Sequence, residues 1–487
     1  MVKQAGVLVA VSSLPSRFGV GDFGIQAYKF IDTLVRMKMK IWQVLPLNPL
    51  GYGNSPYQPY SSFAGDDIYL SIEHLVSDGL LLESEIQEFK PDSLAVDYQG
   101  ARDNKTQMLL KAFARFKAQS NLVKELDRLV ETTSWVYNYA VFVTFKKLNH
   151  GQAWNSWSYE QKSWINNKKL DLTPYKEQID YELFVQFIFF RQWLALKSYA
   201  NANGIQIMGD IPMYLGFDSL DVWENQEMFL LDSEQNPTFV AGVPPDYFST
   251  TGQRWGNPIY NWENLATTKF KFWVERLRGN MQVFDIIRID HFRAFDTYWK
   301  IPVSCPTAVD GEWAEAPGYL LFDTIYRELP DIKIVVEDLG DLLPEVLTLR
   351  DHYQLPGMQV FQFVFNINGD NSLLETLKHT IIYTGTHDNS TLMGWCKSLT
   401  RWQQKLLKRY FKANERTLKH KILRYVMNCA ADYVIFPAQD IIGVGDYARM
   451  NFPSTIGSPN WEWRMNSLQD LNLEANWLGN EVVKSGR

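Results

Sequence analysis

Acidic side chains stand directly after several short apolar runs of this sequence, with arginine and histidine beside them. One such residue has an ordinary explanation, because an aspartate after a strand commonly caps a helix or starts a turn. Several carboxylates gathered at one place are different, since like charges repel one another and cost stability unless a site uses them. The residues concerned are Asp210, Arg288, Asp290, Glu337, Asp338, His387, Asp388 and Asp440.

A cluster of carboxylates has two common uses. The first is to bind a hard metal ion together with histidine. Neither an HxH pair nor an HExxH helix occurs among the seven histidines, so the sequence does not favour a metal-dependent hydrolase, and no cofactor is expected. The second use is glycoside cleavage, in which one carboxyl group attacks the anomeric carbon and another protonates the leaving oxygen.

Asp290 and Glu337 are the best candidates for this pair. Retaining enzymes hold their two carboxyl groups about 5–5.5 Å apart, and adjacent strands lie about 4.8 Å apart, so the ends of neighbouring strands could provide the spacing. Arg288 stands two residues before Asp290, on the same face of its strand, where its charge favours the anion that a nucleophile needs. For Glu337 we expect the opposite, because the neighbouring carboxylates Asp290 and Asp388 would raise its pKa, as an acid needs.

The elements that must position these residues are eight apolar runs, most of them separated by helical patterns. Continuous apolar character indicates strands buried on both faces, as in a parallel sheet. Eight such units predict an α/β fold, a closed (β/α)8 TIM barrel, whose chemistry lies at the carboxyl ends of the strands. An open doubly wound sheet is the alternative. The runs span residues 6–13, 40–47, 205–212, 284–291, 332–340, 358–365, 381–388 and 432–440.

The strands are unevenly spaced along the chain. Residues 68–200, after the second strand, contain long helical and charged segments and predict a mostly helical insertion. Residues 213–270, after the third strand, are rich in Gly, Pro, Asp and aromatic residues and predict ordered loops that cover the active site. No flexible linker interrupts the chain, so residues 1–487 are expected to form a single catalytic barrel with its large inserted subdomains packed onto it.

Composition limits the possible partners. The formal net charge is −7 and no long basic run occurs, which does not favour nucleic-acid binding. No apolar stretch is long enough to span a membrane, and the apolar run at 6–11 is shorter than the about 7–15 residues of a signal peptide. The three cysteines are far apart in the sequence and suggest reduced thiols, so a cytoplasmic protein is expected. Aromatic residues make up 14% of the chain, and several stand in loops, where they suit the faces of sugars as well as protein interfaces.

Segments spread over nearly the whole chain resemble amylomaltases, the 4-α-glucanotransferases also called disproportionating enzymes. RIDHFR (288–293) and THDN (386–389) are moderately specific, whereas AGVPPDYFSTTGQRWGNP (241–258) is long and highly specific. Other matching segments are LPLNPLGYGNSPYQPYSSFAGD (45–66), GDIPMYLGFDSLDVW (209–223), VVEDLG (335–340) and SPNWEWRM (458–465). The resemblance implies an amylase-like barrel and transfer of an α-1,4-glucan segment through a covalent glucosyl-enzyme.

The resemblance also implies roles for individual residues. Asp290 matches the nucleophile, Glu337 the acid/base and Asp388 a third carboxylate that grips the sugar. Tyr57 matches a tyrosine that stacks on the sugar before the cut bond, while Gln253 and Trp255 lie on a mobile loop over the acceptor side. The remaining residues expected to bind substrate are Asp210, Arg288, His387, Ser55 and Asn460.

The implied donors and acceptors are α-1,4-glucans and maltooligosaccharides, without nucleic acid or membrane. Two other functions stay open at this stage. An α-1,4-glucan hydrolase would share the carboxylates and differ only in passing the glucosyl group to water. A non-catalytic glucan-binding protein would keep the aromatic residues but lack one of the three carboxylates, all of which are present. The sequence leaves the oligomeric state open.

Overall fold

Eight short parallel strands form the central sheet of the computed structural model, which describes residues 3–91, 95–245, 249–340, 342–371 and 373–487. All eight lie within or overlap the predicted apolar runs, and nearly all of their residues are buried. Their order in the sheet is β10-β11-β12-β1-β2-β3-β6-β9. The strands are β1 (Gln4–Leu8), β2 (Ile41–Gln43), β3 (Gln206–Ile211), β6 (Ile286–Ile289), β9 (Ile334–Val336), β10 (Gly357–Val360), β11 (Thr380–Tyr383) and β12 (Tyr433–Pro437).

The sheet curls into a barrel that is nearly closed. Its two end strands, β9 and β10, form no ladder, but the Val336 N–H donates to the Pro356 carbonyl across the seam at 3.0 Å. Strand β1 lies between β2 and β12, the last strand of the chain. The predicted TIM-barrel class is therefore confirmed, and an open doubly wound sheet is excluded.

Three of the predicted strands extend into helices. Val11–Ser13 form a 3-10 helix, Phe361–Val364 form the short helix α13, and Ala438–Ile442 form the short helix α18. All three segments lie just beyond the carboxyl end of a strand. Each begins with an apolar residue, so composition alone could not locate the boundary.

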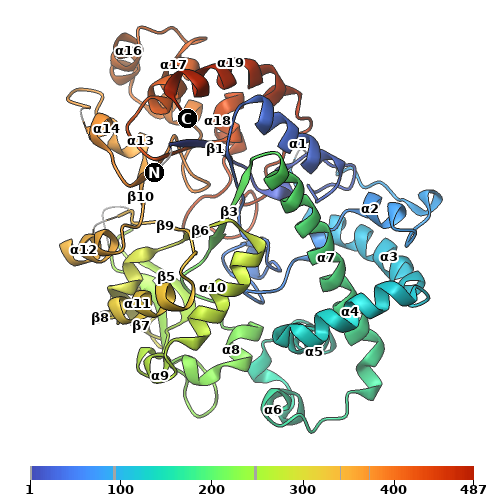
Figure 1. Ribbon diagram of the computed structural model, residues 1–487. Coiled ribbons are helices and arrows are strands. Elements are labelled where there is room, and N and C mark those ends of the chain that lie inside the picture. The colour runs from blue at the N-terminus through green and yellow to red at the C-terminus, as the bar shows by residue number, and fades with distance from the viewer. Residues whose placement is uncertain (1–2, 92–94, 246–248, 341, 372) are drawn as a thin grey trace.

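Helices surround the barrel (Figure 1), and α1 (Ile25–Arg36) shows why they form there. Its buried residues Ala27, Phe30, Ile31 and Leu34 follow the helical period and lie on one face. That face packs near α7 (Lys176–Ala202) and α19 (Gln469–Ser485). The other helices of the barrel layer are α10 (Lys271–Val283), α11 (Gly318–Glu328), α12 (Pro344–His352) and α17 (Leu418–Met427).

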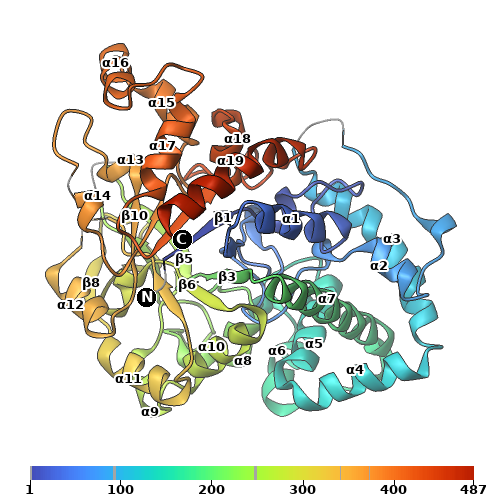
Figure 2. The same cartoon turned by 45° about the horizontal axis from the view of Figure 1, so that its top comes forward.

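Residues 68–200 contain helices that extend to one side of the barrel (Figure 2). The long helix α7 connects the two regions, because it contacts α3, α4 and α5 as well as β3, α1 and α10. The helices before it are α2 (Ile72–Ser77), α3 (Tyr98–Phe116), α4 (Ser120–Thr132), α5 (Ser134–Leu148) and α6 (Tyr159–Asn167).

A buried lysine attaches this helical region to the start of the barrel. Lys105 on α3 is 1% exposed and pairs with Asp22 at 3.3 Å. Its ammonium group also donates to the carbonyl oxygens of Ile68 and Leu70, at 2.7 and 2.9 Å. All of its hydrogen-bonding capacity is therefore used within the protein.

A second, antiparallel sheet differs from the loops predicted for residues 213–270. Its order is β5-β4-β7-β8, with β4 (Phe239–Val243) and β5 (Gln253–Pro258) inside that segment. The partner strands β7 (Thr297–Pro302) and β8 (Glu312–Glu315) come later in the chain and follow the carboxyl end of β6. The remaining helices are α8 (Leu220–Glu224), α9 (Trp262–Thr267), α14 (Leu373–Thr376), α15 (Leu392–Ser398), α16 (Arg401–Tyr410) and α18 (Ala438–Ile442).

Within the described ranges, no helix is both long and apolar enough to cross a membrane.

Candidate active site

The carboxyl ends of four barrel strands bring the predicted polar residues to one rim. Strand β3 carries Asp210, β6 carries Arg288 and leads into Asp290, β9 leads into Glu337, and β11 leads into the segment with His387 and Asp388. The strands β6 and β9 are neighbours, and their ladder continues past its end, because the Glu337 N–H donates to the Ile289 carbonyl at 2.9 Å. A cavity of about 700 Å³ opens at this rim.

Arg288 joins two of the carboxylates. It is 4% exposed, and its guanidinium lies 2.6 Å from Asp210 and 3.0 Å from Asp290. Asp210 is fully buried, whereas the Asp290 side chain is 32% exposed and lines the cavity. Asp210 therefore holds the Arg288 guanidinium in place from the buried side. The same guanidinium also pairs with Asp290, the carboxylate that a ligand can reach.

Glu337 has a different environment. One carboxylate oxygen accepts the His291 N–H and the other accepts the Leu339 N–H, both at 2.8 Å. The pKa of Glu337 is raised to about 7, first by burial and then by the Asp290 carboxylate, while Arg288 opposes the rise. Glu337 is not among the residues that line the cavity, but its carboxylate accepts the backbone N–H of His291, which does line it.

An aromatic group forms one wall of the cavity. Tyr57 stacks on the His387 ring with centroids 5.1 Å apart, and its hydroxyl donates to Asp210 at 2.9 Å. Trp461 lies 5.8 Å from both rings. All three rings line the cavity beside Asp290. Burial, followed by the nearby Asp210, raises the pKa of Tyr57 well above its usual value, so it stays a hydrogen-bond donor.

Asp388 is held from three sides. His387 Nε2 lies 3.4 Å from one of its oxygens, and the Asn451 amide donates to the other at 2.7 Å. Arg449 donates to the Asp388 backbone carbonyl at 2.6 Å. The carboxylate remains 45% exposed and lines the cavity, so it can accept hydrogen bonds from a ligand.

Asp440 fastens the loop that carries His387 and Asp388. It is 1% exposed and does not line the cavity. Its two oxygens accept the Thr384 hydroxyl at 2.5 Å and the Leu392 N–H at 2.7 Å. Both ends of the loop 384–392 are therefore fixed to one carboxylate, whose pKa burial raises to about 6.

The edge strand β5 of the second sheet forms another part of the cavity wall. Gln253 and Trp255 line the cavity, and the indole N–H donates to the Gln253 amide oxygen at 3.1 Å. Trp255 meets His291 edge-on, with centroids 4.9 Å apart. Burial lowers the pKa of His291 to about 4, so this ring is neutral at pH 7. The turn before β5 requires Gly252, which has a φ of +65°.

Two further predicted residues lie in different positions. Ser55 lines the cavity next to Tyr57. Asn460 does not, and its amide is used to hold its own loop, since it accepts the Phe452 N–H at 2.8 Å and donates to the Thr455 hydroxyl at 2.9 Å. Asp338, next to Glu337, is also structural, because it accepts Arg350 at 2.6 Å and the Met358 N–H at 2.5 Å.

Asn451 and Arg449 contact Asp388 but are not predicted from the sequence. They follow the last strand by more than ten residues, whereas the predicted site residues were sought at strand ends. In the segment SPNWEWRM the sequence predicts a substrate contact for Asn460, and it places Trp461 among the loop aromatic residues that suit sugar faces. In the structure Trp461 lines the cavity and Asn460 does not.

The arrangement is suited to chemistry with two carboxyl groups of opposite character. Asp290 is paired with a fixed positive charge, and Glu337 retains a proton near pH 7. Across the described part of the chain, no group of three or more His, Cys, Asp or Glu residues has the arrangement of a metal site. Acid catalysis with nucleophilic attack at a glycosidic carbon fits this pair.

Known proteins are similar to this chain in both sequence and fold. Residues 9–470 match the family described as 4-alpha-glucanotransferase. The 4-alpha-glucanotransferase of Streptococcus pneumoniae is 41% identical over 474 residues, which cover 95% of this chain and 93% of that protein. The enzyme of the same name from Synechocystis sp. is 40% identical, covering 98% and 96%. An amylomaltase from Streptococcus agalactiae, solved in complex with acarbose, has a TM-score of 0.95 at 34% identity and covers 100% of this chain and 99% of its own.

Proposed function

The chain belongs to the 4-alpha-glucanotransferase family, which its sequence matches over residues 9–470, and we propose that Asp290 and Glu337 carry out its reaction by double displacement. The protein is a glycosyltransferase that acts on α-1,4-glucans. The observation that carries the proposed roles is the contrast between the two carboxyl groups. Asp290 contacts Arg288 at 3.0 Å, whereas the pKa of Glu337 is raised to about 7.

In the first step, a carboxylate oxygen of Asp290 attacks the anomeric carbon of the donor glucan. The bond from that carbon to the glycosidic oxygen breaks, and the Glu337 proton passes to this oxygen, which leaves as the 4-hydroxyl of the released piece. Both Glu337 oxygens accept a backbone N–H in the free protein. Protonation of Glu337 weakens one of these two bonds, because the hydroxyl oxygen of a carboxylic acid is a poor acceptor. The Glu337 hydroxyl group can then donate its proton to the glycosidic oxygen.

In the second step, Glu337 acts as a base. It takes the proton from the 4-hydroxyl of an acceptor, whose oxygen attacks the anomeric carbon and releases Asp290. Two inversions give net retention. Asp388 is proposed to accept hydrogen bonds from the sugar hydroxyls beside the reacting carbon, and these strengthen as the ring approaches an oxocarbenium ion.

Water competes with the acceptor in this second step. We propose that Gln253 and Trp255, which line the same cavity as Tyr57, hold the acceptor and exclude water. The donors and acceptors proposed are α-1,4-glucans, maltooligosaccharides and, as the smallest acceptor, glucose. The similar amylomaltase, solved in complex with acarbose, supports the proposal that this chain binds oligosaccharides.

The test is incubation of the purified protein with maltotriose, with products resolved by length over time. A ladder of longer maltooligosaccharides, with glucose released and reducing ends constant, is expected. Shorter products alone, with rising reducing ends, would instead identify an α-1,4-glucan hydrolase. No reaction, together with retained binding, would identify a non-catalytic glucan-binding protein.

The variant Asp290→Asn tests the nucleophile. It removes the attacking anion but keeps the shape of the side chain, so transfer should fall by at least about a thousandfold while maltotriose binding persists. Transfer rate and calorimetric affinity measure the two effects. The control Asp331→Asn alters an exposed aspartate in the turn before β9 and should leave both unchanged. A near-normal rate in Asp290→Asn would refute the assignment.

We also propose a cytoplasmic location. The support is that Cys305, Cys396 and Cys429 are all free thiols, two of them buried, as is usual in a reducing compartment. Fractionation of the native cells, followed by immunodetection, tests this proposal.

A further inference from the structure

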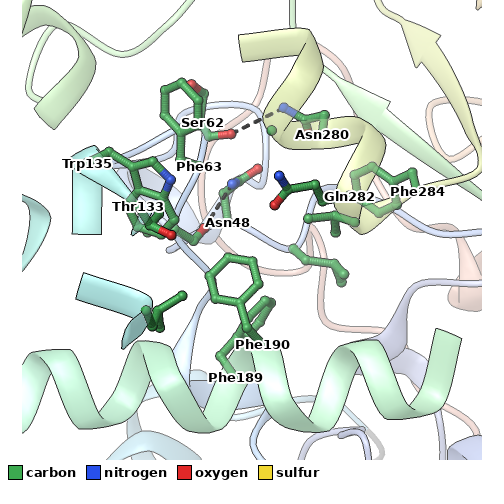
Figure 3. A pocket seen from close by; sticks show the side chains of 15 residues that line it. Asn48, Ser62, Phe63, Thr133, Trp135, Phe189, Phe190, Asn280, Gln282 and Phe284 are labelled. Carbon is green, nitrogen blue, oxygen red and sulfur yellow. Dashed lines mark hydrogen bonds between the residues drawn. The ribbon is translucent and has the colours of Figure 1, made fainter. Parts of the chain in front are cut away.

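The pocket shown in Figure 3 is too small to hold a sugar. It lies between the corner that joins α4 to α5 and the helices α7 and α10, and it shares no lining residue with the catalytic cavity. Its enclosed volume is about 50 Å³, which is room for one or two water molecules at about 30 Å³ each. Asn451, by contrast, lines the catalytic cavity of about 700 Å³.

The Asp388 carboxylate depends on its neighbours for its orientation. Rotation of a carboxylate about its last bond has a broad energy minimum, and this side chain is 45% exposed in the cavity. The Asn451 amide donates to one of its oxygens at 2.7 Å, and His387 Nε2 lies 3.4 Å from the other. A carboxylate has about four acceptor positions, so about two remain for the hydroxyl groups of a sugar.

The backbone of Asn451 is fixed at both of its polar groups. Its N–H donates to the His387 carbonyl at 2.9 Å, and its carbonyl accepts a hydrogen bond from Arg449 Nε at 2.8 Å. The same guanidinium donates to the Asp388 carbonyl at 2.6 Å. Arg449 therefore joins the segment that carries Asn451 to the segment that carries Asp388, and Asn451 presents its amide to the carboxylate from a fixed position.

A neutral donor is the suitable group at position 451. A positively charged side chain there would pair with Asp388 and compete with the sugar, whereas a carboxylate would repel it. An amide orients the Asp388 carboxylate and leaves its charge in place. In the described structure, the titratable and charged groups that act on Asp388 are His387, Arg449 and Tyr57, and all three remain in a variant of Asn451.

We infer that Asn451 is a positioning residue of the transfer reaction, which holds the Asp388 carboxylate in the orientation that meets the sugar hydroxyls. The inference rests on the proposed role of Asp388. The hydrogen bonds between Asp388 and the sugar strengthen in the transition state, so a misoriented carboxylate lowers kcat more than it raises KM.

Two variants, assayed for transfer from maltotriose, test the inference. Asn451→Ala removes the donor without adding charge, and kcat should fall by about tenfold to a hundredfold, the effect of one hydrogen bond to a charged group, with KM within about twofold of the wild type. Asn451→Asp can still donate to Asp388 while its carboxyl group is protonated. Two carboxyl groups so close share one proton, which is lost above about pH 5. The rate of this variant, divided by the wild-type rate, should therefore fall by at least about tenfold from about pH 4.5 to about pH 7.

Division by the wild-type rate removes the pH dependence that Glu337 gives both proteins. The control Asn166→Asp adds the same charge at an exposed position of α6, and its rate ratio should not change with pH. A ratio for Asn451→Asp that is the same at both pH values, whether high or low, would overturn the inference, as would an equal change in the control. Where melting temperatures show that Asn451→Asp does not fold, Asn451→Ala decides, and a kcat within about twofold of the wild type would then overturn it. Failure of the proposed function is separate, because it would appear as absent maltotriose transfer in the wild type.

Discussion

The environment of Glu337 is the basis for proposing it, and not Asp290, as the acid of the pair. The sequence predicted a raised pKa, and the direction is confirmed, but the cause differs. Burial is the largest contribution and Asp290 the second, whereas Asp388 makes no leading contribution. A sequence shows which charged residues follow the predicted strands, and so which of them can lie near one another at the barrel rim. It does not show how deeply a side chain is buried, which depends on packing from elements far away in the chain.

The substitution Glu337→Gln should abolish transfer and change the pH dependence of stability. A carboxyl group whose pKa is raised in the folded state stabilises the fold below its unfolded pKa near 4.5, and this contribution is lost as the pH rises through about 7. Gln does not titrate. The substitution should therefore increase the free energy of unfolding by about 3 kcal/mol more at pH 8 than at pH 4.

Urea unfolding at the two pH values measures this difference. Gln resembles the protonated acid at both pH values, because each offers one good acceptor oxygen to the two N–H groups, so the difference reports the ionisation of Glu337 in the wild type. A change in stability that is equal at pH 4 and pH 8 would show that the pKa of Glu337 is not raised.

The loop 384–392 is an element whose position depends on one buried carboxylate. The sequence placed Asp440 at the end of a strand with the other acidic residues, but the structure gives it a different task. It holds Thr384 and Leu392, and the loop between them carries Asp388 to the cavity. A carboxylate that contacts substrate and one that contacts a loop have the same sequence pattern, so only the fold distinguishes them.

Asp440→Ala should release both ends of this loop. A shift of about 1 Å at a substrate-positioning group can cost about a hundredfold in rate, and we expect a loss of that order, mainly in kcat. Asp440→Asn should recover most of the activity, because an amide can accept from Leu392 and donate to Thr384. Maltotriose kinetics and melting temperatures measure both variants. Equal activity in the two would mean that the paired contacts have no role in positioning.

The second sheet makes the part of the cavity wall that carries Gln253 and Trp255 more rigid than a loop would be. Residues 213–270 were predicted as ordered loops because they are rich in Gly, Pro, Asp and aromatic residues, and the segment QRWGNP in β5 shows no alternation of apolar and polar residues. Its strand character comes from pairing with β4, which pairs in turn with β7. This partner lies outside the predicted insertion, so no local pattern could reveal the sheet.

Trp255→Ala should open this wall to water. The expected result is a severalfold rise in the fraction of glucosyl groups passed to water, since the indole both covers the site and contacts His291. The ratio of new reducing ends to transfer products from maltotriose measures it. The control is Trp313→Ala, on β8 at the far edge of the same sheet. A similar rise in this control would attribute the effect to the sheet as a whole.

The barrel as a whole was predictable because all of its strands are buried on both faces. Each appears in the sequence as a mostly apolar run, and eight such runs, most of them separated by helical patterns, predict the fold class. The packing of the inserted helices was not predictable in the same way. Lys105 illustrates this, because a lysine in an amphipathic helix is usually solvated, yet here it is 1% exposed.

Lys105→Ala should destabilise the whole molecule. It removes the charged partner of the buried Asp22 carboxylate, which keeps only the Ser16 hydroxyl and the Gly24 N–H as donors, and it removes the ammonium donor to two carbonyl groups. Breaking a buried ion pair in this way typically costs about 3–5 kcal/mol. Urea unfolding measures the loss. Lys111→Ala, an exposed site on the same helix, is the control and should change stability little. Equal stability of the two variants would mean that the buried pair contributes nothing to the fold.

The pairing of β1 with β12 has a consequence for synthesis on the ribosome. Strand β1 ends at Leu8, and β12 begins at Tyr433. Synthesis proceeds at about 5–20 residues per second. The edge of β1 that pairs with β12 therefore remains unpaired for about 20–90 s. During this time its backbone groups are open to pairing with other chains. A ribosome that stalls before residue 433 therefore releases a nascent chain with an incomplete barrel, a natural target for chaperones or proteases.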